Sequence, residues 1–276
     1  MGDLAVTLAD AHDEADYGGK AVSLGAAIRA GLPVPPGAAL DAGLVERVVA
    51  GDPAAADAVV GSPHVPSGRL AVRSSAVGED SAGASFAGQH ATKLNVRKGQ
   101  LLDAVRHVWE SGRTGSALTY RERKGLPREP RIGVVVQMLV EPAAAGVMFT
   151  RNPITGADER LIEAAWGLGE VVVNGAVVPD QIRLGFDGRV LEYVEGDKDI
   201  KVWYGDDDGT IELAVDPALR RAPCLTPTQI AALHALSERC IRVWGPHLDI
   251  EWALGGDGDV YLLQCRPITT LPSTPP

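Results

Sequence analysis

The sequence predicts an α+β fold, because strand-like and helix-like segments are mixed without the strict alternation of a doubly wound sheet. The most apolar strand pattern is Ile132–Val140, in the middle of the chain. A hairpin pattern near residue 255 and a long helix pattern after Thr226 lie in the second half. With 276 residues, the chain can form one large domain or two lobes, and the mixture of elements favours two.

In the first half, residues 18–31 predict an amphipathic helix that ends at Gly31, followed by Pro33. An extended segment follows, and then a surface helix and loop between residues 50 and 68. Leu70–Ser75 predicts a strand that ends in two hydroxyls, with a loop of small and polar residues at 76–88. Leu101–Arg123 predicts a helix with a break near Gly112 and Gly115.

In the second half, Gly146–Thr150 and Leu161–Ala165 are further strand candidates. An antiparallel meander is expected next, with Asp-Gly turns at 187–188 and 208–209. Its strands are Ile182–Leu184, Val190–Val194 and Lys201–Tyr204. Thr226 precedes Pro227 and caps a helix that ends near Trp244 and Gly245.

Polar residues interrupt the last two strand patterns, which Gly255–Asp259 joins into a predicted hairpin. Glu251 is the single acid within Ile250-Glu251-Trp252. Gln264 and Arg266 lie two residues apart, so both point to the same face of their strand. A carboxylate, an amide and a guanidinium on paired strands suit a metal ion and a polyphosphate.

Composition excludes several classes of function. The net charge is −10, from 26 basic and 36 acidic residues, which argues against a nucleic-acid-binding protein. No apolar run reaches membrane-spanning length, and the first residues lack a signal-peptide pattern, so no membrane partner is expected. The three cysteines lack CxxC spacing, which indicates free thiols in a cytoplasmic protein rather than a zinc site.

Several other residues have a chemical interpretation and a structural alternative. Lys20, after two glycines and at the start of a helix, could meet a phosphate, but an ordinary helix-start turn looks the same. Arg73 could bind phosphate or form a surface salt bridge. Gln137, near the end of the most apolar strand, could form hydrogen bonds with the edge of a nucleotide base, although strands this apolar usually only form core. Glu163 and Glu170 could meet a metal or be solvated, and the six histidines are interpreted as structural.

The order of these motifs resembles a known family. The shared segments run along the chain from about residue 16 to 270. They are Gly18–Gly25, Ala71–Ala76 with Ser85–His90, Gln137–Val140, Gly146–Pro153, Gly167–Glu170 with Pro179-Asp180, Asp249–Trp252 and Gln264–Pro267. This set resembles the N-terminal ATP-binding domain of phosphoenolpyruvate synthase, pyruvate phosphate dikinase and rifampin phosphotransferase.

The resemblance implies an ATP-grasp-like fold with ATP in the cleft between two lobes, residues 1–138 and 139–268, followed by a Pro-rich tail at 269–276. It also implies the site residues. Lys20, Arg73 and Arg266 would be catalytic residues that bind phosphates. Gly88 and Thr92 would lie in a loop over the triphosphate. The adenine would be held by Gln137, Met138, Leu139 and Val140, and Mg²⁺ by Glu251 and Gln264.

In this family the ATP-binding domain phosphorylates a histidine on a separate swivelling domain, and no histidine here matches that motif. The resemblance therefore implies a component that binds Mg·ATP, cleaves it to AMP and phosphorylates a histidine on another domain or partner protein. Two alternatives stay open. One is a self-sufficient ATP-grasp kinase or ligase with a small-molecule acceptor, and the other is a non-catalytic ATP-binding module.

Overall fold

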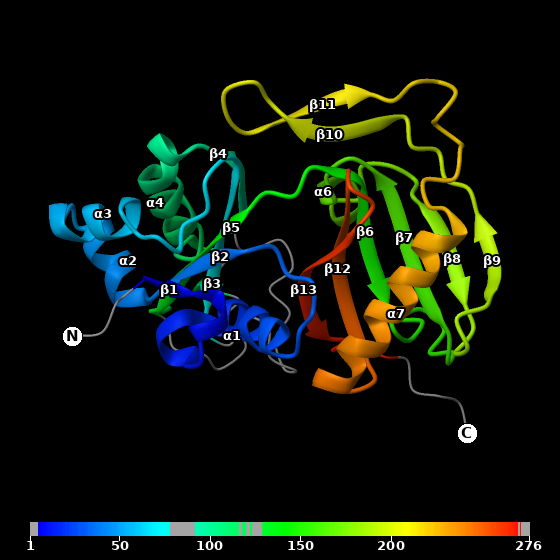
Figure 1. Ribbon diagram of the computed structural model, residues 1–276, viewed down its shortest axis with the longest axis horizontal. Helices are drawn as coiled ribbons and strands as arrows, with labels where there is room; N and C mark the ends of the chain where they lie inside the picture. The colour runs from blue at the N-terminus through cyan, green and yellow to red at the C-terminus, as the bar shows by residue number, and fades with distance from the viewer. Residues whose placement is uncertain are drawn as a thin grey trace. The chain divides into compact units, whose positions relative to one another are not determined.

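The computed structural model of the chain describes residues 5–77, 92–115, 118–119, 122, 129–269 and 271. The chain divides into two compact units (Figure 1). Unit 1 comprises Met1–Arg29, Pro35–Leu139 and Tyr204–Gly209, and unit 2 comprises Ala30–Val34, Val140–Trp203 and Thr210–Pro276. Each unit combines helices with a largely antiparallel sheet, which confirms the predicted α+β class.

Unit 1 contains a five-stranded sheet in which every neighbouring pair is antiparallel. Its order is β1 (Ala5–Thr7), β2 (Gly37–Leu40), β5 (Ile132–Met138), β3 (Leu70–Ala76) and β4 (Thr92–Val96). The central pair, β5 and β3, consists of the two strands that the apolar patterns predicted. Almost every residue of both strands is buried, so the pair forms the middle of the unit.

Helices cover both faces of this sheet. On one face, alternate residues of the central strands, such as Val72 and Val134, pack in one apolar cluster with α2 (Ala42–Val49), α3 (Pro53–Val60) and α4 (Leu101–Ser111). Helix α1 (Glu14–Arg29) contacts β3 and β5 instead. Short 3-10 turns, η1 (Leu8–Asp10) and η2 (Lys98–Gln100), lie beside them.

Unit 2 contains a six-stranded antiparallel sheet in the order β13-β12-β6-β7-β8-β9. The strands are β6 (Pro142–Phe149), β7 (Arg160–Trp166), β8 (Asp180–Leu184), β9 (Val190–Val194), β12 (Leu248–Gly255) and β13 (Val260–Pro267). Helix α7 (Pro227–Trp244) packs on β12 and β13, as Figure 1 shows. The short helix α6 (Glu170–Val173) contacts β6 and β7.

The predicted cap of α7 is confirmed. The Thr226 hydroxyl accepts a hydrogen bond from the Gln229 amide, and the Gln229 side chain accepts one from the Thr226 amide. This reciprocal arrangement satisfies two amides that the first turn of a helix leaves without partners. The helix ends at Trp244, and Gly245 follows with a φ of 93°.

The expected meander is partly wrong. Strands β8 and β9 do pair, through a turn in which Gly188 has a φ of 81°. However, β10 (Ile200–Tyr204) leaves the sheet and pairs with β11 (Thr210–Ala214) in a separate two-stranded sheet. The alternation of apolar residues predicts a strand equally well in either sheet, so it could not assign the partner.

The sequence patterns also missed some elements. Helix α2 and the three-residue strand β1 were not predicted, because each is short. The helix predicted over 101–123 ends at Ser111, so the break expected near Gly112 is confirmed for α4. The three cysteines are buried free thiols. Among the described helices, none has both the length and the apolar character needed to cross a bilayer.

Candidate functional site

Lys20 lies on α1, which is interrupted just before it. Gly18 has φ 78° and ψ 165°, which is not a helical conformation. The Lys20 side chain is buried, with 5% of its surface exposed. Its Nζ donates a hydrogen bond to the carbonyl oxygen of Ser74, at 3.2 Å. The ammonium group of Lys20 is therefore held against the strand that carries Arg73.

Tight packing between α1 and β3 sets the position of this interruption. A Cβ atom at Gly18 would lie 1.9 Å from the carbonyl oxygen of Ser75, so only glycine fits there. Three residues later, the amide of Ala21 donates a hydrogen bond to Ser75 Oγ, at 3.0 Å. Gly133 on β5, which pairs with Ser75, also lies close to α1, because a Cβ there would be 2.5 Å from the Tyr17 carbonyl oxygen.

Arg73 is a buried residue of β3, and it shares the α1-facing side of that strand with Ser75. It is the ladder partner of Val135 on β5 and of Thr92 on β4. Thr92 is thus the first residue of a strand rather than part of a loop. Gly88, the other residue expected over the triphosphate, lies outside the described residues.

The segment Gln137–Leu139 lies at the C-terminal end of β5, the central strand of unit 1. The side-chain amide nitrogen of Gln137, Nε2, donates a hydrogen bond to the carbonyl oxygen of Pro35, at 3.1 Å. The backbone amides of Met138 and Leu139 donate to Pro36 and Arg69, each at 2.9 Å. Because these three nitrogens already donate hydrogen bonds within the protein, an adenine would be contacted by other atoms of Gln137, Met138 and Leu139. Val140, the fourth residue expected at the base, is a buried residue of unit 2.

The predicted C-terminal hairpin is confirmed, and it brings four polar side chains to one face. Glu251 pairs with Gln264, and two residues away Asp249 pairs with Arg266. Opposite residues of an antiparallel pair project to the same face, as do residues two apart on one strand. Glu251, Gln264 and Arg266 are site residues predicted from the sequence, and the structure adds Asp249 to them.

Asp249 holds Arg266 in place. Its Oδ2 accepts hydrogen bonds from Arg266 Nε at 2.9 Å and from Nη2 at 2.8 Å. Burial raises the pKa of Asp249, the charge of Arg266 opposes this rise, and the charge of Glu251 adds to it. Oδ1 of Asp249 is buried and has no hydrogen-bond partner among the described residues. The strand register contained the signal for Asp249, which lies two residues before Glu251 and across from Arg266.

These residues suit a magnesium ion. Glu251 and Gln264 offer a carboxylate and an amide oxygen from adjacent strands, and Mg²⁺ prefers oxygen ligands. Within the described ranges, no group of three or more His, Cys, Asp or Glu side chains is placed to hold a metal. One or two protein side chains suffice where Mg²⁺ is bound together with substrate phosphates.

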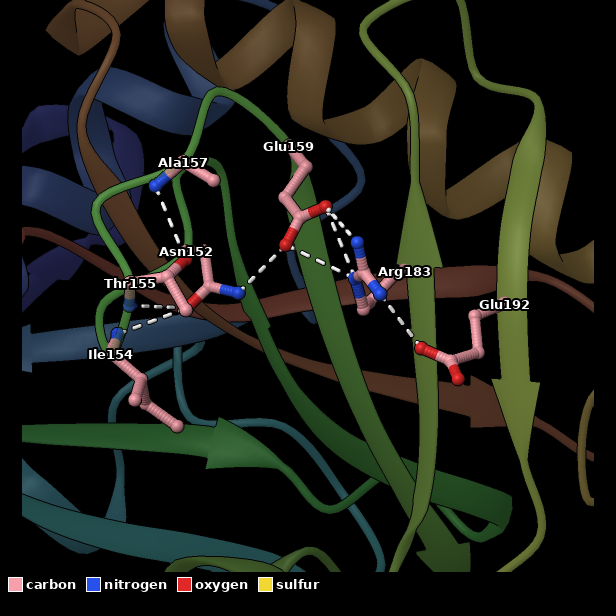
Figure 2. A network of polar contacts seen from close by, with 7 residues as sticks. All are labelled: Asn152, Ile154, Thr155, Ala157, Glu159, Arg183 and Glu192. Carbon is pink, nitrogen blue, oxygen red and sulfur yellow. Dashed lines mark hydrogen bonds and ion pairs between the residues drawn. The ribbon is translucent and has the colours of Figure 1, made fainter.

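The motif Thr150–Pro153 is followed by a loop held by a polar network (Figure 2). Asn152 Oδ1 accepts from the amides of Ile154 and Thr155, and Asn152 Nδ2 donates to Glu159 Oε1 at 2.8 Å. Arg183 donates to both oxygens of Glu159 and also to Glu192. These bonds lower the pKa of Glu159, mainly through Arg183. The network orders the connection between β6 and β7.

Asp180, from the Pro179-Asp180 motif, lies in a second network. Both it and Lys198 are fully buried, and they form an ion pair. Asp180 also accepts hydrogen bonds from the Tyr193 hydroxyl and from the amides of Gly196 and Cys224, at 2.8 to 2.9 Å. Burial acts to raise the pKa of Asp180, but the hydrogen bonds, led by that from Lys198, lower it. The motif thus has a structural role.

The remaining acidic candidates have local partners. Glu163 accepts a hydrogen bond from Gln181, at 3.0 Å. Burial raises the pKa of Glu170, and a weak hydrogen bond from the Thr210 hydroxyl opposes that rise. Neither residue belongs to the four polar side chains of the β12–β13 hairpin.

Comparison with known proteins gives one family and several relatives. The sequence model of one family, described as pyruvate phosphate dikinase, AMP/ATP-binding domain, matches residues 54–275. A probable phosphoenolpyruvate synthase of Methanothermobacter thermautotrophicus is 45% identical over 73% of this chain and 30% of its own length. A rifampicin phosphotransferase of a Streptomyces species is 41% identical over 75% of this chain and 24% of its own.

The prodigiosin synthesizing transferase PigC of Serratia marcescens is 39% identical over 92% of this chain and 31% of its own length. The chain therefore spans about a third or less of these relatives. Among solved structures, the VanG D-Ala:D-Ser ligase of Enterococcus faecalis aligns with a TM-score of 0.45 and 13% identity, over 90% of this chain and 52% of that one. This similarity is too weak to support an inference.

Proposed function

Because the chain belongs to the pyruvate phosphate dikinase AMP/ATP-binding domain family, we propose that it binds Mg·ATP, cleaves it to AMP and phosphorylates a histidine on another domain or protein. One phosphoryl group goes to the histidine, and the other goes to water as orthophosphate. The observation that carries this proposal is the set of four polar side chains on the β12–β13 hairpin. Family membership also supports the ATP-grasp-like fold that the motifs imply. The acceptor histidine would lie outside this chain, whose matched part covers only about a third or less of each of these relatives.

In unit 1, Lys20 and Arg73 bind phosphate oxygens, while Gln137–Leu139 hold the base. Both cations are buried, which favours strong interaction with a phosphate because water screens them little. Lys20 is also fixed by the Ser74 carbonyl, so it is ordered before ATP arrives.

In unit 2, Glu251 and Gln264 hold the magnesium ion, which when bound neutralises charge on the phosphates. Arg266 stabilises the charge that develops on the transferred group, and Asp249 keeps its guanidinium fixed.

The test uses ATP labelled in its β- and γ-phosphates, in the presence of Mg²⁺. The chain is incubated alone and then with a purified histidine-domain protein from a relative. We expect AMP, together with an acid-labile, alkali-stable phosphoryl group on the added protein. Label on a small molecule other than orthophosphate, in the absence of any histidine domain, would instead support the self-sufficient kinase or ligase. ATP binding without any turnover would support a non-catalytic module.

A further inference from the structure

We infer that Ser75 is a positioning residue for Lys20, acting through the backbone of α1. The importance of this role for ATP rests on the proposed function, because it assumes that Lys20 binds a phosphate. The structural part of the inference does not depend on ATP. It follows from how the second part of α1 begins.

The helix restarts after Gly18, and the first amides of any helix lack partners within it. Usually a Ser, Thr, Asp or Asn side chain at the residue before the helix accepts a hydrogen bond from the second or third amide. Gly18 has no side chain to do this. It also cannot gain one, because its φ is 78° and a Cβ would collide with the Ser75 carbonyl.

Ser75 supplies the missing cap from the neighbouring strand. Its Oγ accepts the hydrogen bond of Ala21, the third residue after Gly18, which is the amide that a cap normally serves. Lys20 therefore lies in a turn whose backbone is fixed by Ser75 and whose own Nζ is bound to the Ser74 carbonyl. Ser74 thus fixes the side-chain end of Lys20, and Ser75 fixes the backbone beside it.

The neighbouring serine provides a matched control. Ser74 is as deeply buried as Ser75, but its Oγ has no hydrogen-bond partner among the described residues. The Lys20 ammonium donates to the backbone carbonyl of Ser74, which an alanine would keep. Ser74→Ala and Ser75→Ala therefore remove the same atom from adjacent buried positions, and only Ser75→Ala removes the cap.

The first test needs no nucleotide. The chain is labelled with limiting acetic anhydride, and the acetylation rate of Lys20 is measured by mass spectrometry. Loss of the cap loosens the turn, so Ser75→Ala should raise this rate about three- to tenfold, as expected for one lost hydrogen bond. Ser74→Ala should leave the rate unchanged. Equal rates in both variants would overturn the inference.

If Ser75→Ala does not fold, the unmodified chain still provides a test. Hydrogen exchange read at single-residue resolution should show protection of the Ala21 amide comparable to that of the later amides of α1. An Ala21 amide that exchanges as fast as a solvent-exposed one would contradict the cap. This measurement also requires no ATP.

The second test links the cap to the proposed function by a double-mutant cycle. Ser75→Ala should weaken Mg·ATP binding about three- to tenfold in the unmodified chain and have little effect when Lys20 is already replaced by alanine. An undiminished effect in the Lys20→Ala background would show that Ser75 does not act through Lys20. If the unmodified chain binds no ATP, the proposed function fails, while the acetylation result still decides the role of Ser75.

Discussion

Asp249 and Arg266 face each other across the β12–β13 ladder, and one carboxylate oxygen of Asp249 binds two nitrogens of Arg266. This relationship makes the phosphate-binding role proposed for Arg266 depend on a second residue. Asp249→Asn keeps the shape of the side chain but removes its charge. We expect ATP affinity to fall about tenfold and the free energy of unfolding to fall by about 1.5–3 kcal/mol, the range for hydrogen bonds to charged groups.

Calorimetry and urea unfolding of the Asp249→Asn variant provide the two values. An unchanged ATP affinity together with lowered stability would mean that the pair is structural only. In that case Arg266 would not be the phosphate ligand that we propose.

Glu251 carries the metal-binding part of the account. Glu251→Gln keeps an oxygen but removes the negative charge that attracts Mg²⁺. We expect Mg²⁺-dependent turnover of ATP to fall by at least about a hundredfold while the melting temperature without ligand changes little. Asp259→Asn, in the exposed turn of the same hairpin, removes an equal charge and should leave turnover unchanged. Comparable turnover in both variants would contradict the assignment of Glu251.

Breaking the buried pair of Asp180 and Lys198 should strongly destabilise the fold. Lys198→Met leaves the Asp180 carboxylate buried without its charged partner, which should cost about 3–5 kcal/mol of unfolding free energy. The exposed pair of Arg106 and Asp103 offers a comparison, because Arg106→Gln should cost less than about 1 kcal/mol. Denaturant unfolding of both variants gives these free energies. Similarly small losses in the two variants would show that the buried pair contributes little to stability.

Glu159 should make stability depend on pH. Its folded-state pKa lies below the ordinary value of 4.5, so its ionised form stabilises the fold at pH values above 4.5. That contribution is lost as the pH falls through the lowered folded-state pKa. Glu159→Gln should therefore be less stable than the unmodified chain at pH 7, with a difference that shrinks in acid. Urea midpoints measured at pH 7 and at acid pH check this, and a constant difference would contradict it.

The sequence predicted those features that depend on local patterns. Alternation and the Gly255–Asp259 turn were enough to place Glu251, Gln264 and Arg266 on one hairpin, and Thr226 with Pro227 was enough to start α7. The separation of β10 from the six-stranded sheet could not be predicted, because strand patterns do not identify partners.

The supporting residues were also beyond the reach of local patterns. Ser75 caps a helix that lies 54 residues away in sequence, and Lys198 meets Asp180 across 18 residues. Such contacts depend on tertiary packing rather than on spacing. Asp249 is a different case, because its position two residues before Glu251 already placed it on the face of the site.

The most direct test of the account is a calorimetric titration of the chain with ATP in the presence of Mg²⁺, repeated with the metal chelated. We predict a single class of sites whose affinity falls at least about tenfold without Mg²⁺, together with a rise in melting temperature when Mg·ATP is bound. The absence of both binding heat and a melting shift with ATP and with ADP would contradict the claim that this chain is an ATP-binding component.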